Sequence, residues 1–284
     1  MYPNLNCGAI GVQATLPQAI EYARRYGFGG IDFSITEARD LAQAHGGSSY
    51  VRDLFARAGV RPGSFGFPVD FRQDHAAWAN GMAALPELAK LAVALGCERT
   101  ATWIMPCDNE RDFAANFKFH VDRLQPAAQV LADHGIRFGL EFIGPHTLRV
   151  SRTHRFIYTM EGMLALGAAI GTGNVGLLLD IWHLYTSYGL TKQVRELRNE
   201  DVVVVHINDA PVGLDVDEQI DNQRALPGET GVLDIGGFLE ALVAIGYDGP
   251  VTAEPFSRRV REMAPEDAVA ATAASVRSVW SVVA

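Results

Sequence analysis

Residues 174–208 read NVGLLLDIWHLYTSYGLTKQVRELRNEDVVVVHIN and contain two short apolar runs, 174–180 and 202–208, separated by an amphipathic stretch at 190–198. The apolar runs have the length and the Val, Ile and Leu content typical of strands, and the stretch between them has a helical period. Strand–helix alternation requires parallel strands joined by right-handed crossovers. The segment therefore predicts one strand–helix–strand unit.

The same alternation runs through the rest of the chain. Further strands are predicted at residues 7–13, 29–35, 60–67, 99–105, 136–142 and 250–256. Most of the helical segments end in a glycine that can adopt the left-handed conformation, at positions 27, 59, 96, 135, 171 or 173, and 246. Eight repeats of about 30–40 residues predict an α/β fold, a closed (β/α)8 TIM barrel, as a single domain over residues 1–284. The alternative is an open doubly wound sheet, but the GxGxxG turn that marks it does not follow the first predicted strand.

Composition limits the classes of partner. The chain has 284 residues, of which 48% are hydrophobic and 20% charged, which indicates a folded protein. The net charge of −9 argues against a nucleic-acid partner, because phosphate binding needs a clustered positive surface. No apolar run approaches the ~20 residues of a membrane span, and the first residues lack a secretion leader, so we expect a soluble, cytoplasmic protein. Three cysteines without a CxxC pair are expected to be buried free thiols.

Each of the last four predicted strands carries an acidic residue or a histidine at or near its end. Because active sites of TIM barrels form at the C-terminal ends of the strands, four side chains are expected to converge there: Glu141, Asp180, His206 and Glu254. Carboxylates that share such a place repel one another unless a cation or protons neutralise them. The set suits one divalent metal ion, for which Mn²⁺ is our first choice and Mg²⁺, Co²⁺ and Zn²⁺ are alternatives. The other interpretation is that each residue separately caps a strand or bonds a neighbouring helix.

Three further residues are expected to bind substrate. His183 lies just past a strand end, where it contacts either a substrate hydroxyl or its own loop. Arg224 opens the segment RALPGETGVLD and either contacts the substrate or forms a surface ion pair. Trp103, together with Trp182 and Phe67, lies near other strand ends, where these rings form a wall for a sugar ring or belong to the core.

Two loops near the expected site are strongly charged. Residues 211–223 are acidic and form a longer loop than most compact domains contain, so they are either a lid over the barrel mouth or a solvated excursion. Residues 144–156, GPHTLRVSRTHRF, are basic. They clamp a substrate phosphate through arginine, balance the protein's own acidic surface, or contact another subunit.

The motifs resemble the xylose isomerase-like TIM-barrel superfamily of sugar isomerases and epimerases. The resemblance lies in the C-terminal half, in GLEFIG (139–144), LLLDIWH (177–183), VVVVHINDAP (202–211), RALPGETGVLDI (224–235) and VTAEPF (251–256). It implies that the metal ligands are Glu141, Asp180, His206 and Glu254. It also implies that His183 and Arg224 bind substrate.

The resemblance is closest to the inosose isomerase-like branch, in which an insertion also separates the HINDAP strand from the RALPG turn. Ketose 3-epimerases carry a second glutamate six residues after the first ligand and a substrate arginine six residues past the metal histidine. This chain has Thr147 and Val212 at those positions. The difference argues against a free-ketose 3-epimerase and leaves the substrate open.

The implied reaction is metal-assisted proton transfer beside the carbonyl group of a sugar, a sugar phosphate or a cyclitol ketone, through a cis-enediolate. Glu141 and Glu254 are the expected catalytic residues, which remove and return the proton. The main alternative is a lyase or dehydratase that acts on a keto-sugar or a dehydroshikimate-like acid. An endonuclease IV-like repair enzyme and a non-catalytic sugar-binding barrel are further alternatives. The resemblance also implies a homo-oligomer, either a dimer or a tetramer.

Overall fold

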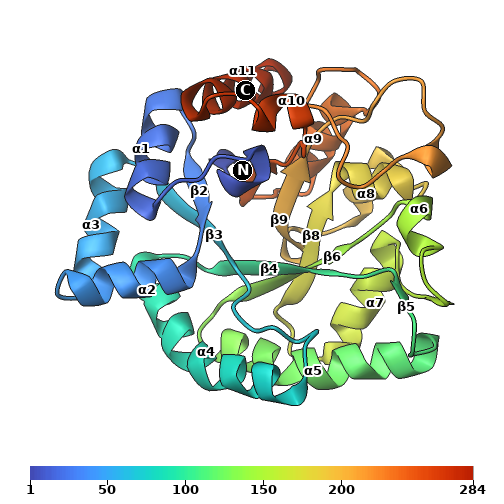
Figure 1. Ribbon diagram of the computed structural model, residues 1–284, viewed down its shortest axis with the longest axis horizontal. Helices are drawn as coiled ribbons and strands as arrows, with labels where there is room; N and C mark the ends of the chain where they lie inside the picture. The colour runs from blue at the N-terminus through green and yellow to red at the C-terminus, as the bar shows by residue number, and fades with distance from the viewer. Residues whose placement is uncertain (284) are drawn as a thin grey trace.

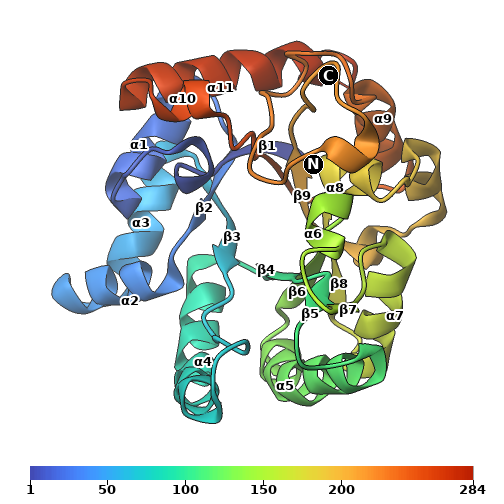
Figure 2. The same ribbon diagram turned by 45° about the vertical axis from the view of Figure 1, so that its right-hand side comes forward.

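The computed structural model describes residues 1–283, and eight of its strands are parallel and close into a barrel (Figure 1, Figure 2). The barrel strands are β1 (Tyr2–Leu5), β2 (Gly30–Phe33), β3 (Arg61–Gly66), β4 (Arg99–Ile104), β6 (Arg137–Phe142), β8 (Val175–Asp180), β9 (Val202–Ile207) and β10 (Pro250–Ala253). Each strand lies beside its predecessor in the chain, and β1 closes the ring by pairing with both β2 and β10. The predicted (β/α)8 TIM barrel is confirmed.

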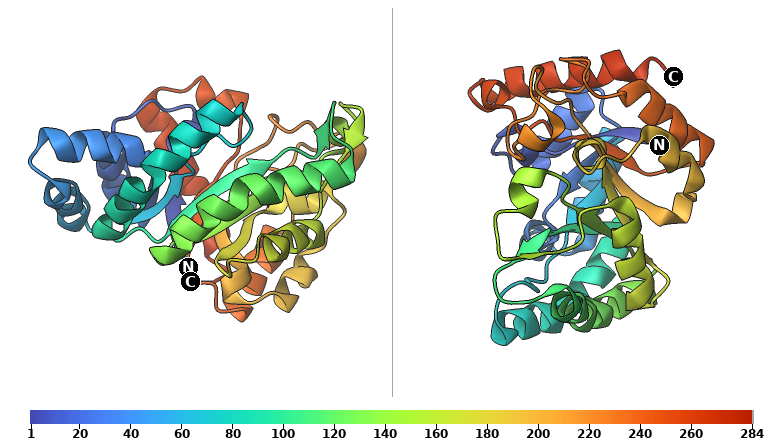
Figure 3. Two further views of the ribbon diagram at one scale, coloured as in Figure 1. Left: turned by 90° about the horizontal axis from the view of Figure 1, so that it is seen from below. Right: turned by 90° about the vertical axis from the view of Figure 1, so that its right-hand side faces the viewer.

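Helices surround the barrel on its outside, as the two further views in Figure 3 show. The α-helices are α1 (Leu16–Tyr26), α2 (Ile35–Ala44), α3 (Ser48–Ala58), α4 (His75–Leu95), α5 (Phe113–Asp133), α6 (His146–Arg149), α7 (Met160–Ile170), α8 (Ile181–Thr186), α9 (Ile235–Ala244), α10 (Arg258–Arg261) and α11 (Pro265–Trp280). The 3-10 helices are η1 (Gly8–Ile10), η2 (Thr191–Glu196), η3 (Asn199–Asp201) and η4 (Val216–Glu218). A small antiparallel sheet joins β5 (Cys107–Asp108) to β7 (His154–Arg155).

Helix ends follow the expected capping chemistry. Helix α1 begins after Thr15, whose backbone N–H donates to the side chain of Gln18 at 2.9 Å. It ends at Gly27, which has a φ of 81° and donates its N–H to a carbonyl of the last turn. Helix α4 ends in the same way at Gly96, with a φ of 82°. A side chain at these two positions would strain the backbone, which explains why glycine marks the passage into the next strand.

The first strand was predicted in the wrong place. It is Tyr2–Leu5, whereas residues 8–10 of the predicted segment 7–13 form η1. The N–H of Val12 donates back to the carbonyl of Cys7 at 2.9 Å, which folds this apolar segment into a turn. The true strand was hidden because proline and asparagine, which are depleted in strands, stand at its centre.

The crossover between β8 and β9 also differs from the prediction. The expected helix at 190–198 is the 3-10 helix η2, and the α-helix of this unit is the short α8 directly after the strand. Tyr188 has a φ of 65°, and the N–H of Gly189 turns back to the carbonyl of Leu184 at 2.8 Å. This reversal ends α8 after six residues. Helix α2 was not predicted.

Strands β6, β8, β9 and β10 are buried on both faces, which explains their continuous apolar runs. All six residues of β9 are buried. Leu178 and Val204 stand two residues before Asp180 and His206, so they point to the same side of their strands. With Ala101 they belong to a small apolar cluster separate from the main core, which forms the floor beneath the strand ends.

Two smaller predictions can be compared with the structure. The three cysteines are free and buried, as expected. Among residues 1–283, no helix combines the length and the apolar character needed to cross a membrane.

Candidate metal centre

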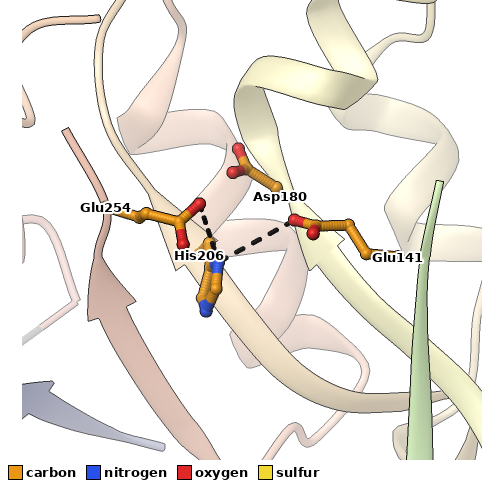
Figure 4. Close-up of side chains that lie close together, drawn as sticks. All are labelled: Glu141, Asp180, His206 and Glu254. Atoms are coloured by element: carbon orange, nitrogen blue, oxygen red, sulfur yellow. Dashed lines mark ion pairs between the residues drawn. The ribbon is translucent and has the colours of Figure 1, made fainter. Parts of the chain in front are cut away.

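Four side chains from successive strands meet at the C-terminal end of the barrel (Figure 4). Their potential ligand atoms all lie within 4.8 Å of one another, and the residues are Glu141 on β6, Asp180 on β8, His206 on β9 and Glu254 just after β10. Asp180 and His206 are direct partners in the register of β8 and β9. The parallel register thus delivers side chains with the same orientation to one place.

Burial and mutual repulsion disturb the ionisation of these groups. Burial, and then the charge of Glu254, raise the pKa of Glu141 well above its ordinary value. Burial disfavours the charged form of His206, but the charges of Glu254 and Glu141 outweigh it and raise its pKa to about 10. A group of buried carboxylates in this state is stabilised by added positive charge.

Two of the potential ligand atoms are buried without a hydrogen-bond partner among residues 1–283. They are Oε1 of Glu141 and Nδ1 of His206. Nδ1 of His206 lies 3.8 Å from Oε1 of Glu141 and 3.3 Å from Oε2 of Glu254 (Figure 4). An unsatisfied buried polar atom costs about 1–3 kcal/mol. Both atoms face the same centre, and oxygen donors with one imidazole suit a divalent cation, so the residues present fit a metal ion.

Arg224 is the positive group that lies against this cluster. Its Nη1 donates to Oδ2 of Asp180 at 2.7 Å and to Oε2 of Glu254 at 3.2 Å. Its Nε and Nη2 donate to the backbone carbonyl and the side chain of Asp221 at 2.9 and 2.7 Å. The guanidinium is buried and lies 4.6 Å from the centre of the Trp182 ring. The residue expected to bind substrate is therefore brought together with two of the expected metal ligands, and all three of its nitrogens are engaged.

His183 is buried beside the same cluster. Its Nδ1 accepts the backbone N–H of Gly144 at 3.2 Å, and burial, followed by the charge of Arg224, lowers its pKa well below the ordinary value. A neutral imidazole that accepts at Nδ1 carries its proton on Nε2. Nε2 lies 3.8 Å from Oε1 of Glu141 and 3.1 Å from Nη2 of Arg224. Donors from Gly144 and Arg224 thus each face one nitrogen of the ring, and a neutral ring accepts from only one of them at a time.

Asn208 and Asp209 hold the site together and were missed in the sequence. Asn208 is fully buried, and its Nδ2 lies 3.1 and 3.3 Å from the two oxygens of Asp180. Asp209 accepts backbone N–H groups of Thr230 and Gly231 at 3.1 and 2.8 Å, which ties the PGETG turn to the end of β9. The alternation that places His206 in the mouth also points to Asn208, because the two residues are two positions apart.

Trp103 lies beside the cluster, on the neighbouring strand β4. Its Cα is paired in register with that of Glu141, and 44% of the residue is exposed. The guanidinium of Arg72 lies 3.7 Å from the centre of its ring. Of the two other aromatic residues, Trp182 is fully buried behind the site and Phe67 packs against Phe138 at 4.5 Å between ring centres.

The acidic and the basic loops contact each other beside the mouth. Arg149 of the basic loop is buried, lies 3.5 Å from Asp217 of the acidic loop, and stacks over the ring of Tyr158. The hydroxyl of Thr147 donates to the carbonyl of Gln219 at 2.9 Å, and Gln219 is fully buried. The acidic loop is thus anchored at the buried Gln219, although most of its residues are exposed, and Arg149 faces one of its acidic side chains.

A cleft of about 1190 Å³ lies on the other side of the mouth, along the ends of β1, β2 and β3. Asp32 forms part of its lining and accepts hydrogen bonds from Asn4 at 2.8 Å, Ser64 at 2.6 Å and Thr252 at 3.1 Å. Thr252 lies on β10, two residues before Glu254. Thr252, which is paired in register with His206, therefore joins Asp32 at the cleft to the strand that leads to Glu254.

Comparison with curated proteins gives two kinds of relative. The 3-dehydroshikimate dehydratase of Pseudomonas aeruginosa is 28% identical over 250 residues, which are 87% of this chain and 37% of that protein. The inosose isomerase of Bacillus subtilis is 26% identical over 155 residues, which are 54% of this chain and 51% of that protein. This chain thus spans well under two thirds of the length of either relative.

Comparison with solved structures gives the same family. A xylose isomerase domain protein from Alicyclobacillus acidocaldarius has a TM-score of 0.87 at 26% identity, and the match covers 99% of this chain and 98% of that one. The IOLI protein with a bound zinc atom has a TM-score of 0.80 at 19% identity, with the same coverage, which is a likeness of fold. The inosose isomerases agree with the branch expected from the sequence. The family model described as xylose isomerase-like TIM barrel matches residues 20–279, and the chain belongs to this family.

Proposed function

We propose that the chain is a divalent-metal-dependent isomerase or epimerase that moves a proton beside the carbonyl group of a polyhydroxylated ketone. The observation that carries the proposal is the cluster of Glu141, Asp180, His206 and Glu254, in which two buried ligand atoms face one centre without a partner. These four residues would hold the ion. When bound, the ion would polarise the ketone and stabilise negative charge on its oxygen.

Glu141 and Glu254 are suited to the proton transfer itself. They lie on opposite sides of His206 (Figure 4), and each contributes one atom to the cluster, so each retains a second carboxylate oxygen. A ketone between them would present one face of the neighbouring carbon to each carboxylate. Return of the proton to the other carbon of the enediolate gives a positional isomer, whereas return to the same carbon on the opposite face gives an epimer.

His183 and Arg224 would hold the substrate oxygens. A neutral His183 cannot accept from both Gly144 and Nη2 of Arg224, so a substrate oxygen near Nε2 would accept from Nη2 of Arg224 and, with the proton on Nε2, from His183 as well. Thr147 and Val212 replace the glutamate and the arginine of ketose 3-epimerases. Thr147 bonds the acidic loop, and Val212 is 66% exposed, so neither supplies such a contact.

A second candidate is β-elimination from a keto-acid. A relative that matches 87% of this chain is named a 3-dehydroshikimate dehydratase. The same proton abstraction begins both reactions, and loss of a hydroxyl from the adjacent carbon completes the elimination. An unsaturated product that absorbs ultraviolet light separates it from isomerisation.

The test is deuterium incorporation in D₂O by the Mn²⁺-loaded protein, measured by NMR with inososes, ketoses and 3-dehydroshikimate. Turnover of at least one ketone is expected to place deuterium beside the carbonyl. Glu254→Gln is expected to lower kcat by about 10²–10⁴-fold, because general acid–base catalysis contributes that much. The matched control is Glu87→Gln, which alters an exposed helix residue. Near-normal kcat in Glu254→Gln, with the fold intact, would contradict the proposed role.

A further inference from the structure

Arg72 is held in one orientation at the edge of the barrel mouth. It lies between β3 and α4, and its guanidinium stands 3.7 Å from the ring centre of Trp103 and 4.3 Å from that of Phe71. Its Nη2 donates to the hydroxyl of Thr102 at 3.0 Å and to the backbone carbonyl of Trp103. Two aromatic faces and two acceptors therefore fix a side chain that is usually mobile.

The remaining donors of Arg72 point to no protein acceptor. Among residues 1–283, nothing accepts a hydrogen bond from its Nε or Nη1, and no carboxylate oxygen lies within 4.0 Å of its guanidinium nitrogens. Partial burial lowers its pKa to about 10, against the opposing charge of Asp70, so it is cationic at neutral pH. Arg224 differs, because all three of its nitrogens bond to Asp180, Glu254 or Asp221.

The position of Arg72 connects it to the metal centre. It lines both the 1190 Å³ cleft and a second cleft of about 420 Å³, so it stands on the ridge between them. Trp103, over which it stacks, is paired in register with Glu141 on the next strand. A ligand that reaches from the four-residue cluster along this rim would meet the free edge of Arg72.

Charge gives this placement a consequence. Three carboxylates form the centre, and the whole chain carries a net charge of −9, so an anionic ligand is repelled unless a specific cation attracts it. Guanidinium N–H groups are strong donors to carboxylate and phosphate oxygens. A carboxylate or phosphate group would therefore bind to the free donors of Arg72, which is a fixed cation without an ion-pair partner.

We propose that Arg72 binds an anionic group of the substrate, a carboxylate or a phosphate, while the ketone end lies at the metal centre. The inference rests on the proposed function for its ketone end, but the anion site can be tested without turnover. Trp103 is then a platform that positions Arg72.

The experiment is calorimetric titration of the Mn²⁺-loaded protein with three probes: shikimate, inorganic phosphate and neutral myo-inositol. At least one anionic probe is expected to bind at least tenfold more tightly than myo-inositol. Arg72→Gln is expected to weaken that binding by about 10–100-fold, the loss of one or two charge-assisted hydrogen bonds. Arg72→Lys keeps the charge but not the planar donor set, so its affinity is expected to lie between those of the wild type and Arg72→Gln. Loss with shikimate alone identifies a carboxylate site, and loss with phosphate alone identifies a phosphate site.

The control is Arg57→Gln, an exposed arginine on α3 that lines neither cleft. Its affinities should equal those of the wild type, and all variants should keep the wild-type metal content and unfolding temperature. Equal affinity for all three probes, absence of binding, or anion binding that survives Arg72→Gln would overturn the inference. If anion binding survives Arg72→Gln but is lost when the metal is removed, the metal itself holds the anion. Metal content reports on the proposed function separately, because Arg72 contacts none of the four clustered residues.

Discussion

Replacing Asn208 with alanine is expected to weaken metal binding without unfolding the barrel. Asn208 is fully buried, and its Nδ2 lies 3.1 and 3.3 Å from the two oxygens of Asp180. A hydrogen bond to a charged group contributes about 1.5–3 kcal/mol, and these long distances favour the lower end. Since about 1.4 kcal/mol corresponds to a factor of ten, the Kd for Mn²⁺ should rise about tenfold. Residues that orient metal ligands typically contribute about 10–100-fold.

The assay is titration of Mn²⁺ into the metal-free protein against a chelating dye at fixed pH. Asn174→Ala is the matched control, because Nδ2 of Asn174 donates to the carbonyls of Ala128 and Ile136 at 3.1 and 2.8 Å, at the other end of β8. It should lower stability but leave the Kd within about twofold of the wild type. If Asn208→Ala binds Mn²⁺ as tightly as the wild type, Asp180 does not depend on Asn208 and the reasoning is refuted.

Two further predictions concern packing and pH. Gly144→Ala should lower stability by about 1–3 kcal/mol in thermal unfolding and reduce kcat/KM, because its new Cβ would overlap the carbonyl oxygen of His183. The control Gly236→Ala, whose Cβ would meet only Val282 at 4.0 Å, should change neither quantity. Burial lowers the pKa of His120 to about 4, against about 6.5 in the unfolded chain. As pH falls between these values, the unfolded chain takes up a proton that the folded protein does not, so the free energy of unfolding decreases. Unfolding free energy should fall by about 2 kcal/mol from pH 7 to pH 5 relative to His120→Gln, and parallel curves for the two proteins would contradict this.

The fold followed from the sequence where the strands are long and apolar. The runs 174–180 and 202–208 predict β8 and β9 within one residue of their observed bounds. Strand β1 was missed because Asn4 stands in it, and only tertiary contacts with Asp32 and Thr252 make that buried amide favourable. Local sequence carries no sign of such partners.

The four clustered residues could be predicted because strand ends of a parallel barrel converge. The contacts of Arg224 and Arg72 could not, because each depends on where a loop places its charge. Arg224 is drawn to Asp180 and Glu254, whereas Arg72 is held by Trp103, a residue 31 positions away. Loop position is set by packing across the whole mouth rather than by the residues of the loop itself.

The central claim is that one divalent ion is held by Glu141, Asp180, His206 and Glu254. Its most direct test is elemental analysis of the purified protein after reconstitution with Mn²⁺, compared with the Asp180→Ala/His206→Ala double variant. The account predicts about one divalent ion per chain in the wild type, as for a single site, and almost none in the variant. A wild-type protein that takes up no metal, or a variant that retains it, would contradict the account.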